Sequence, residues 1–505
     1  MFRRPTAVLL RSRGSCQLVE GARWSPLLCS TRLLPCSSST PAPRHCSVAT
    51  GGGVEGVAAV VQRLVDIHGQ PVPSLTAEIL ARQLVSGYRA LDAPARAHLL
   101  RHLATRHRVD PGRAREAAAR LAAAPAGTEA RLQEEVREAL VPPHNHVFRR
   151  VGQLEGGVKF LVDLRAHLLA ALGQGEADTL ALRQMSSSLQ ALLAHWFSVG
   201  FLQLERVSWN SPCSLLEKVA ALEAVHPVRD WTDLRARVGP YRRCFVYSHP
   251  SMPGEPLVLL HVALTETIAS TVSGLVKDHR QVRGAGAEVW RGQEGAQVEE
   301  GAKVQAAIFY SVTSTQPGLA GIEMGTHLIK GAVASLAAEF PSLNTFSTLS
   351  PVPGFRAWLL VLLTKAARGE EAPLTPGEVE QVCAALGPGC PYTALGQVLR
   401  SAAWVARPDL HPLLSALLTR LCARYLYLEK RRSSALNPVA NFHIRNGACM
   451  WRINWLADPS PRGMEASCGL MVNYRYYLDR LEANSLAYLT THAIDADSQV
   501  TDLLA

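Results

Sequence analysis

The chain has 505 residues, of which 48% are hydrophobic and 19% charged, and its formal net charge is +10. This length exceeds that of a single core, so we expect two or three domains, and the composition is that of a globular rather than a disordered protein. No apolar run approaches the roughly 18 to 20 residues that a spanning helix needs, so no membrane span is expected.

The positive charge is concentrated at the N-terminus. Residues 1–50 contain seven arginines and a single acid, Glu20, which leaves little net charge on the rest. A nucleic-acid-binding protein would keep a basic patch in its folded part, so that class is set aside. The segment is rich in Arg and Ser, which is typical of a mitochondrial transit peptide. A disordered tail is the alternative that composition leaves open.

Cysteine patterns exclude further classes of site. Eleven cysteines are present, four of them within residues 1–50. The other seven form no CxxC pair and no Cys/His zinc spacing, and the chain has no HExxH, Walker A or GxSxG motif. We therefore expect no metal site and interpret most cysteines as reduced thiols of a protein that is not secreted.

Residues 54–197 are predicted to be helical almost throughout. Asp110 followed by Pro111 forms an N-cap and first-turn pair, and Thr76 is a second candidate N-cap. Apolar residues recur at helical spacing, and no catalytic constellation occurs here. Residues 51–198 are therefore predicted to be an all-α helical bundle for packing or self-association.

Three segments are expected to lie outside the regular elements. His144 and His146 lie in a proline-rich stretch, which we interpret as a solvated loop. Residues 280–301 are glycine-rich and charged, which predicts a surface loop. Residues 495–505 are expected to be weakly ordered, as chain termini often are.

The rest of the chain is organised around residues 304–340. Residues 306–312 are rich in strand-forming types, a loop with Gly318 follows, and apolar residues then recur at helical spacing. A helix entered from a glycine loop offers backbone N–H groups and the positive end of its dipole to a phosphate. The alternative is a plain strand–helix connection in which Gly318 and Gly321 only turn the chain.

Further strands and helices surround this unit. A helical insertion is predicted from Phe355 to about Arg432, and residues 436–455 and 471–478 return to the sheet. Within the first of these segments, Asn437-Pro438 begins a turn or helix that Gly447 ends before a strand at 448–455. Mixed strands and helices behind a helical bundle predict an α+β protein, with a catalytic α/β domain over residues 199–505.

Two residues in this part could carry chemistry. Ser350 lies at the carboxyl end of a predicted strand, where ligands collect in open sheets, although a serine there can also bond its own turn. His443 lies between Phe442 and Ile444 and is expected to be partly buried, so its pKa would move and it could act as acid or base. A satisfied core histidine is the alternative.

Long stretches of the chain resemble the malonyl-CoA decarboxylase family. The resemblance covers about residues 55–478 and is strongest after Phe201. The stretches that carry it are LERVSWNSPC (204–213), AVHPVRDW (224–231), RVGPYRRCFVYSHPSMPGEPLVLLHVALT (237–265), GIEMGTHLIK (321–330), FSTLSPVPGF (346–355), ALNPVANFHIRNGACMWRINWLAD (435–458) and CGLMVNYRYYL (468–478).

The resemblance implies a helical oligomerisation domain followed by a catalytic domain of the GNAT acetyltransferase type with a helical insertion. In that fold a strand, a glycine loop and a helix N-terminus hold the CoA pyrophosphate. The catalytic residues implied are Ser350 and His443, and Tyr476 and Glu323 also match active-site positions. The family's substrate-binding run falls on Ala320, Gly321, Ile322, Glu323, Met324, Gly325 and Thr326.

The activity implied is the conversion of malonyl-CoA to acetyl-CoA and CO2, a step in fatty acid metabolism. The thioester delocalises the carbanion as an enolate, so neither a metal nor pyridoxal phosphate nor another cofactor is expected. Ser350 would bond the carboxylate or accept a proton, and His443 would protonate C2. Glu323 and Tyr476 would set the position and charge of this pair.

The resemblance also implies self-association, expected to give a homotetramer, in which cysteines can link subunits. Cys213 matches one such position, whereas the second falls on Pro250. Family members that enter peroxisomes end in Ser-Lys-Leu, whereas this chain stops at Asp502–Ala505, so peroxisomal import is not expected. The mitochondrial matrix is expected instead, with a cytoplasmic location for a form lacking the leader.

Two other functions stay open at this point. The same CoA site could serve an acyltransferase, which would need an acceptor substrate. A CoA-binding scaffold that acts through its helical domain is the third class, and the presence of both Ser350 and His443 speaks against it.

Overall fold

The computed structural model describes residues 53–504 apart from 71–72, 126, 174, 176–177, 278–298 and 323. The predicted transit peptide, most of the loop predicted at 280–301, and Glu323 therefore lie outside the described residues. Among the residues that are described, no helix combines the length and the apolar character needed to cross a membrane.

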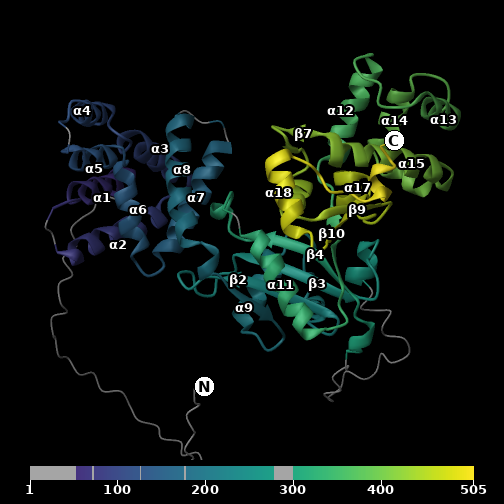
Figure 1. The fold of residues 1–505 in the computed structure, drawn as a ribbon, viewed down its shortest axis with the longest axis horizontal. Coiled ribbons are helices and arrows are strands. Elements are labelled where there is room, and N and C mark those ends of the chain that lie inside the picture. Colours follow the sequence, from purple (N-terminus) through teal and green to yellow (C-terminus); the bar gives the residue numbers. More distant parts are fainter. Residues whose placement is uncertain are drawn as a thin grey trace, which may run out of the picture. The chain divides into compact units, whose positions relative to one another are not determined.

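The first part of the chain is helical, as predicted (Figure 1). Helices α7 and α8 contact each other, and α3 and α6 pack against both. The helices are α1 (Val54–Asp66), α2 (Ser74–Ala90), α3 (Ala93–Arg106), α4 (Pro111–Ala122), α5 (Glu129–Ala139), α6 (Pro143–Gly152), α7 (Gly157–Gly173) and α8 (Thr179–Trp196).

The cap predictions had different outcomes. Asp110 caps α4 by accepting from the backbone N–H of Gly112 at 2.8 Å, as predicted. The prediction for Thr76 is wrong, because α2 begins at Ser74, after Pro73 in the N-cap position, and Thr76 lies inside the first turn. The N-cap residue, Pro73, has no polar side-chain atom, so no side-chain cap is formed.

The interpretation of His144 and His146 as loop residues is also wrong. Both belong to α6, in which Pro143 occupies the first helical position, where proline is tolerated, rather than breaking the chain. His144 is buried, and the ring of His146 stacks on His68 with the ring centroids 3.4 Å apart. The two prolines therefore start a helix that belongs to the bundle core.

The second part is built on a mixed sheet of eight strands in the order β1-β2-β3-β4-β5-β10-β6, with β9 on the other side of β10. All neighbours are antiparallel except β4 and β5, which are parallel. The strands are β1 (Gln203–Val207), β2 (Arg242–Ser248), β3 (Val258–Thr265), β4 (Ala306–Ser314), β5 (Thr345–Thr348), β6 (Ser350–Pro351), β9 (Cys449–Asn454) and β10 (Met471–Tyr476).

Strands β4 and β5 separate at their carboxyl ends. They pair only from Ala306 with Thr345 to Phe309 with Thr348. Beyond that point β4 continues to Ser314 against β3, whereas the line of β5 continues as β6 against β10. The predicted strand, loop and helix lead from β4 into α11 (Gly325–Glu339), which connects to the parallel strand β5. This order of strand, loop and helix is the one that the resemblance implies.

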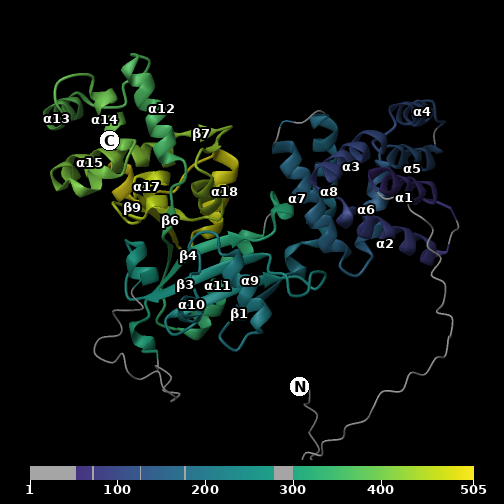
Figure 2. The same ribbon diagram turned by 180° about the vertical axis from the view of Figure 1, so that it is seen from behind.

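The helical insertion is present between β6 and β9. Figures 1 and 2 show its helices α12 to α15 grouped together, and α12 and α15 contact α17 and β9 respectively. The helices of this part are α9 (Cys213–Leu222), α10 (Trp231–Arg237), α12 (Phe355–Ala367), α13 (Pro376–Leu386), α14 (Pro391–Leu399), α15 (His411–Ala423), α16 (Pro438–Arg445), α17 (Pro461–Ser467), α18 (Leu481–Thr491) and α19 (Ser498–Thr501). Two short strands, β7 (Lys430–Arg431) and β8 (Ser434–Ala435), form a hairpin.

The expectation of a weakly ordered tail is wrong. The backbone of Met450 in β9 bonds to both Asp495 and Asp497, at 2.9 and 3.0 Å. Asp497 then caps α19, and Val500 in that helix is fully buried. The apolar residues of the tail are too few to show a periodic pattern, but a backbone bridge to a core strand is enough to order it.

Candidate functional site

Ser350, His443 and Tyr476 meet at the point where β4 and β5 separate. The hydroxyl of Ser350 lies 3.0 Å from Nε2 of His443, and Nδ1 of His443 lies 2.8 Å from the phenolic oxygen of Tyr476. All three side chains are buried, at 3–4% exposure. Residues 93 and 33 positions apart in the sequence thus form one hydrogen-bonded chain.

Each of the three residues is placed by a different element. Ser350 is held in β6 by pairing with Val472 of β10. Tyr476 ends β10, where it pairs with Phe346 of β5. His443 lies on α16, whose N-cap, Asn437, accepts from two first-turn N–H groups at 2.9 and 3.0 Å. The sheet therefore fixes the serine and the tyrosine, and a capped helix fixes the histidine between them.

A further hydroxyl sets the direction of this chain. Ser350 donates its hydroxyl proton to Oγ1 of Thr348 at 2.9 Å. Oγ1 of Thr348 also accepts from the backbone N–H of Tyr474. Since a serine has one proton to donate, its oxygen is left to accept, and His443 is its partner. Hydrogen then sits on Nε2 of His443, and Nδ1 accepts from the Tyr476 hydroxyl. Each residue thus donates a hydrogen bond to the next in the order Tyr476, His443, Ser350, Thr348.

Burial fixes the protonation states. It lowers the pKa of His443 to about 3, so the imidazole is neutral at neutral pH. Burial also raises the pKa of Tyr476, which therefore stays protonated. The His443 ring stacks on Tyr474 with centroids 4.6 Å apart, which limits its rotation. The histidine is a neutral N–H donor in a fixed orientation.

The loop after Ser350 is tied to the helix that carries His443. Asn437 is fully buried, and besides capping α16 its Nδ2 donates to the Pro353 carbonyl at 2.9 Å. Tyr425, at the end of the helical insertion, donates to the same carbonyl at 3.0 Å.

Sequence reasoning missed Thr348 and Asn437 as site residues. The Asn437-Pro438 pair is a helix-start signal that could have pointed to Asn437.

A cavity of about 420 Å³ adjoins the site. Its lining includes Lys330 and Val333 of α11, Asn446 at the end of α16, and Tyr476. Tyr476 therefore belongs both to the hydrogen-bonded chain and to the wall of the cavity. The cavity therefore lies between α11 and the carboxyl end of β10.

The substrate-binding run expected from the resemblance lies in the loop before α11. Ala320, Gly321 and Ile322 follow a 3₁₀ turn at Pro317–Leu319, and Gly321 has φ +80°, a conformation that favours glycine. Met324 precedes the first residue of α11, Gly325, and no side chain caps this helix start. Glu323 and the side chain of Thr326 lie outside what the structure describes. Among the described residues, no hydrogen bond joins this loop to Ser350 or His443.

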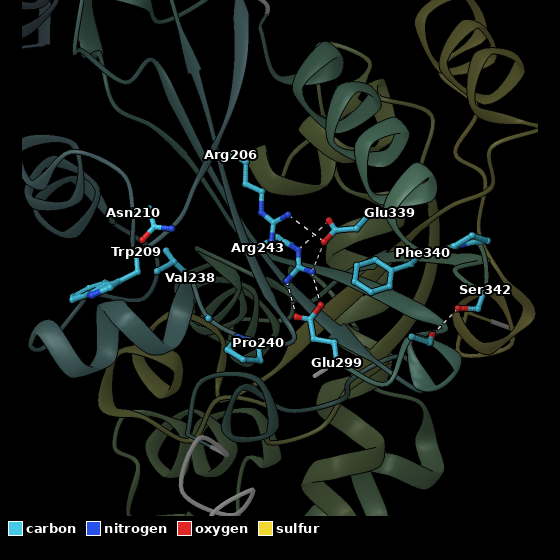
Figure 3. A pocket seen from close by; sticks show the side chains of 13 residues that line it. Arg206, Trp209, Asn210, Val238, Pro240, Arg243, Glu299, Glu339, Phe340 and Ser342 are labelled. Atoms are coloured by element: carbon cyan, nitrogen blue, oxygen red, sulfur yellow. Dashed lines mark hydrogen bonds and ion pairs between the residues drawn. The ribbon is translucent and has the colours of Figure 1, made fainter. Parts of the chain in front are cut away.

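A larger cavity lies elsewhere. It measures about 890 Å³ and is lined by the start of β2 and the carboxyl end of α11. Figure 3 shows its charges paired with one another: Arg243 contacts both Glu299 and Glu339 at 2.6 Å, and Arg206 contacts Glu339 at 3.1 Å. Because each of these groups already has a partner of opposite charge, these charged residues do not select a charged ligand.

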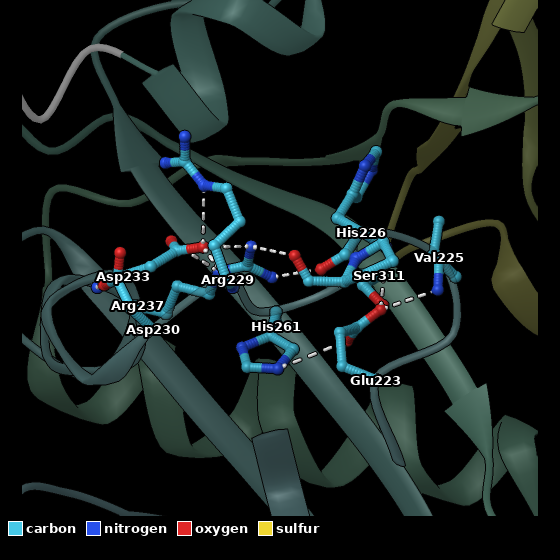
Figure 4. A network of polar contacts seen from close by, with 10 residues as sticks. Glu223, Val225, His226, Arg229, Asp230, Asp233, Arg237, His261 and Ser311 are labelled. Atoms are coloured by element: carbon cyan, nitrogen blue, oxygen red, sulfur yellow. Dashed lines mark hydrogen bonds and ion pairs between the residues drawn. The ribbon is translucent and has the colours of Figure 1, made fainter. Parts of the chain in front are cut away.

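A second buried cluster occupies the sheet beside α10. Figure 4 shows Glu223 accepting from Ser311 and from the backbone N–H groups of Val225 and His226, at 2.8 to 3.0 Å. Nε2 of His261 lies 3.3 Å from the same carboxylate. Arg237 forms a buried ion pair with Asp233 at 3.0 Å.

Two further expectations concern metals and cysteines. Within the described part of the chain, no group of three or more His, Cys, Asp or Glu side chains is arranged to hold a metal ion. Cys213 is exposed at the first residue of α9, with its sulfur 4.0 Å from the Glu217 carboxylate.

The fold and site define an α+β protein with a helical bundle, a mixed sheet that opens between two parallel strands, and a buried Ser–His–Tyr chain at that opening. A family model described as the malonyl-CoA decarboxylase C-terminal domain matches residues 200–505, and one of the N-terminal domain matches residues 107–197. The chain belongs to the malonyl-CoA decarboxylase family.

Individual relatives agree with this assignment. The Mus musculus protein named malonyl-CoA decarboxylase, mitochondrial, is 43% identical over 498 residues, covering 95% of this chain and 97% of its own. The protein of the same name from Anser anser anser is 44% identical over 437 residues, covering 85% and 84%. The crystal structure of malonyl-CoA decarboxylase from Rhodopseudomonas palustris superimposes with a TM-score of 0.74 at 31% identity, covering 89% of this chain and 99% of that one.

Proposed function

We propose that the chain is an enzyme, a carboxy-lyase that converts malonyl-CoA to acetyl-CoA and CO2 and so controls malonyl-CoA in fatty acid metabolism. The observation that carries the proposal is the hydrogen-bonded chain from Tyr476 through His443 to Ser350, at the positions where the family places its active site. The function itself is supported by the family membership of almost the whole chain.

The substrate would lie between the loop before α11 and the Ser350–His443 pair. The uncapped start of a 15-residue helix supplies N–H groups and a positive dipole end for the CoA phosphates. The cavity between α11 and Tyr476 is a place for the pantetheine arm. The acyl end then reaches the separated strand ends, where Ser350 and His443 are.

The chemistry requires one proton from outside the substrate. When the C–C bond breaks, CO2 leaves, the electron pair stays on C2 as the thioester enolate, and C2 must gain a proton. His443 holds a proton on Nε2, which passes to C2. Because Tyr476 donates to Nδ1 and stays protonated, it gives its proton to His443 only as it takes another from solvent in the cavity. Before substrate binds, this N–H donates to the Ser350 oxygen, so Ser350 and Thr348 fix the orientation of the imidazole from which the proton passes to C2.

The remaining proposals concern setting and assembly. We propose a mitochondrial protein with a transit peptide at residues 1–50, a helical oligomerisation domain at 51–198 and a catalytic domain at 199–505. Mitochondrial location is supported by the names of the relatives, and the matrix is the compartment we propose. We also propose a homotetramer, in which the exposed Cys213 is available for an interchain disulfide. The reaction as written uses no metal, pyridoxal phosphate or other cofactor.

The test is a product assay with purified protein and malonyl-CoA. CO2 and acetyl-CoA should appear in equal amounts without any acceptor substrate. An acyltransferase using the same site would instead require an acceptor and release free CoA. Absence of CO2 from a folded protein that binds malonyl-CoA would overturn the proposal.

A further inference from the structure

The loop before α11 is held by the helical part of the chain. Arg165 of α7 donates through Nη1 to the carbonyls of Gly318 and Ala320, at 2.5 and 2.9 Å. Its Nη2 donates to Oε1 of Gln190 in α8 at 3.0 Å, and Nε2 of Gln190 donates to the Gly321 carbonyl at 3.0 Å. Two side chains from two helices thus hold three carbonyls within four residues of the loop.

The loop backbone also packs directly against these helices. A Cβ at Gly318 would lie 1.8 Å from the carbonyl oxygen of Val162 in α7, so only glycine fits there. A Cβ at Gly321 would lie 2.9 Å from Nε2 of Gln190, in addition to the strain of its φ of +80°. Gly318, which could have been a simple turn residue, therefore permits a close approach between two backbones, and Gly321 leaves room for the Gln190 side chain.

Arg165 and Gln190, together called the clamp, also place a positive charge beside the loop. Arg165 is 2% exposed, and its Nε is buried without a hydrogen-bond partner. Burial lowers the pKa of Arg165 below its ordinary value, but a guanidinium stays charged in proteins. Because its hydrogen-bond partners among the described residues are neutral carbonyls and an amide, none of these partners cancels the charge. A buried cation next to a helix N-terminus adds to the field that attracts an anion.

We propose that Arg165 and Gln190 are positioning residues for the CoA phosphates, through which the helical part of the chain controls substrate affinity. By holding the loop carbonyls inward, they fix the path by which the chain enters α11 and so the direction of its first N–H groups. The inference rests on the proposed binding of malonyl-CoA at residues 320–326.

The test compares two substrates on the Arg165→Met variant. With malonyl-CoA, KM and the inhibition constant of free CoA should rise about tenfold, the usual size for losing a charge-assisted contact, while kcat changes much less. With the malonyl thioester of N-acetylcysteamine, which has no phosphates, kcat/KM should change little. Arg165→Lys keeps the charge but loses the forked geometry of the guanidinium donors. Its KM and inhibition constant should therefore lie between those of Arg165→Met and the parent protein.

Two controls keep the result interpretable. Arg96→Met removes an arginine that likewise donates to two carbonyls in the helical part, those of Tyr88 and Arg89, but lies away from the loop, so KM should not change. Gln190→Leu tests the clamp with a milder change if Arg165→Met fails to fold. Equal losses on both substrates would contradict the inference.

The phosphate site in the loop and the role of the clamp can be tested separately. If Gly321→Val raises the KM for malonyl-CoA but neither Arg165→Met nor Gln190→Leu does, the loop binds the substrate and the clamp is irrelevant. If none of the three variants changes CoA affinity, the loop is not the phosphate site, and the proposed substrate position is wrong.

Discussion

Two buried clusters in the sheet contain similar groups but differ in how their hydrogen bonds end. Ser311, His261 and Glu223 form one, and Ser350, His443 and Tyr476 form the other. Both histidines are buried, and burial lowers the pKa of His261 to about 4 and that of His443 to about 3. Neither burial nor pKa separates them.

The difference lies in what surrounds each group. The Glu223 carboxylate accepts from a hydroxyl and two backbone N–H groups, with His261 beside it on β3, a strand that is paired on both sides. The described residues of the Ser350 cluster include no carboxylate, and the cluster ends at Tyr476, which lines a cavity near the place where two parallel strands separate. A carboxylate held by a hydroxyl and two backbone N–H groups stabilises the fold, whereas a chain of donors that ends at a cavity can move a proton.

The largest effect should come from His443. If it protonates C2, His443→Asn should lower kcat by about 10²- to 10⁴-fold, the usual contribution of a positioned general acid. Affinity for malonyl-CoA should change little, because the CoA part supplies most of the binding. The measurement is steady-state kinetics, with circular dichroism to confirm folding. Near-normal turnover in a folded variant would remove His443 from the mechanism.

The other cluster should affect stability and not turnover. Glu223→Ala leaves the Ser311 hydroxyl and two backbone N–H groups without their acceptor and removes the carboxylate beside His261, which should cost at least about 3 kcal/mol of unfolding free energy. Chemical denaturation measures this loss, and kcat per folded enzyme should stay normal at a temperature where the variant is folded. A large fall in kcat without loss of stability would make this cluster part of the catalytic site.

Tyr476 should have an intermediate effect. Tyr476→Phe keeps the ring that packs against Phe309 but removes the donor to Nδ1 of His443, so the proton is no longer replaced directly. We expect kcat to fall about tenfold, at the low end for a proton-transfer group, with little change in KM. Tyr488→Phe is a matched control, because it removes another buried tyrosine hydroxyl that bonds Asn441. Equal effects of both variants would point to general loosening.

The smallest expected effect is that of pH on kcat. Because burial holds the pKa of His443 near 3, its protonation should cause no inflection in kcat between about pH 6 and 8. Stability should behave differently. The unfolded histidine binds a proton below about pH 6.5 and the folded one only near 3, so stability is complete above 6.5 and is lost as the pH falls. A kcat inflection near pH 6.5 that disappears in His443→Asn would contradict this assignment.

Much of the fold could be predicted because its signals are local. The cap at Asp110, the strand before the glycine loop and the helix start at Asn437 are each encoded by a few neighbouring residues. The errors occurred where a local signal has two meanings. Prolines before His144 start a helix rather than a loop, and the tail is ordered by a bridge to Met450 that no sequence pattern reveals.

The site was only partly accessible from the sequence. The residue patterns indicate Ser350 and His443 but leave structural alternatives open, and only the resemblance points to Tyr476. Thr348 was missed because its role depends on facing Ser350 across a change of strand, and Arg165 because its partners are 153 and 155 positions away. Contacts between side chains and distant backbone carbonyls leave no periodic signal in a sequence.

The most direct test of the central claim is a double-mutant cycle on Ser350 and His443, with CO2 release from malonyl-CoA as the readout. If the two residues act as one unit through their 3.0 Å contact, Ser350→Ala and His443→Asn should each slow turnover. The double variant should then be barely slower than the slower single variant, because residues that act together are not additive. Losses that multiply fully in the double variant would contradict the account, since they would mean that serine and histidine contribute independently.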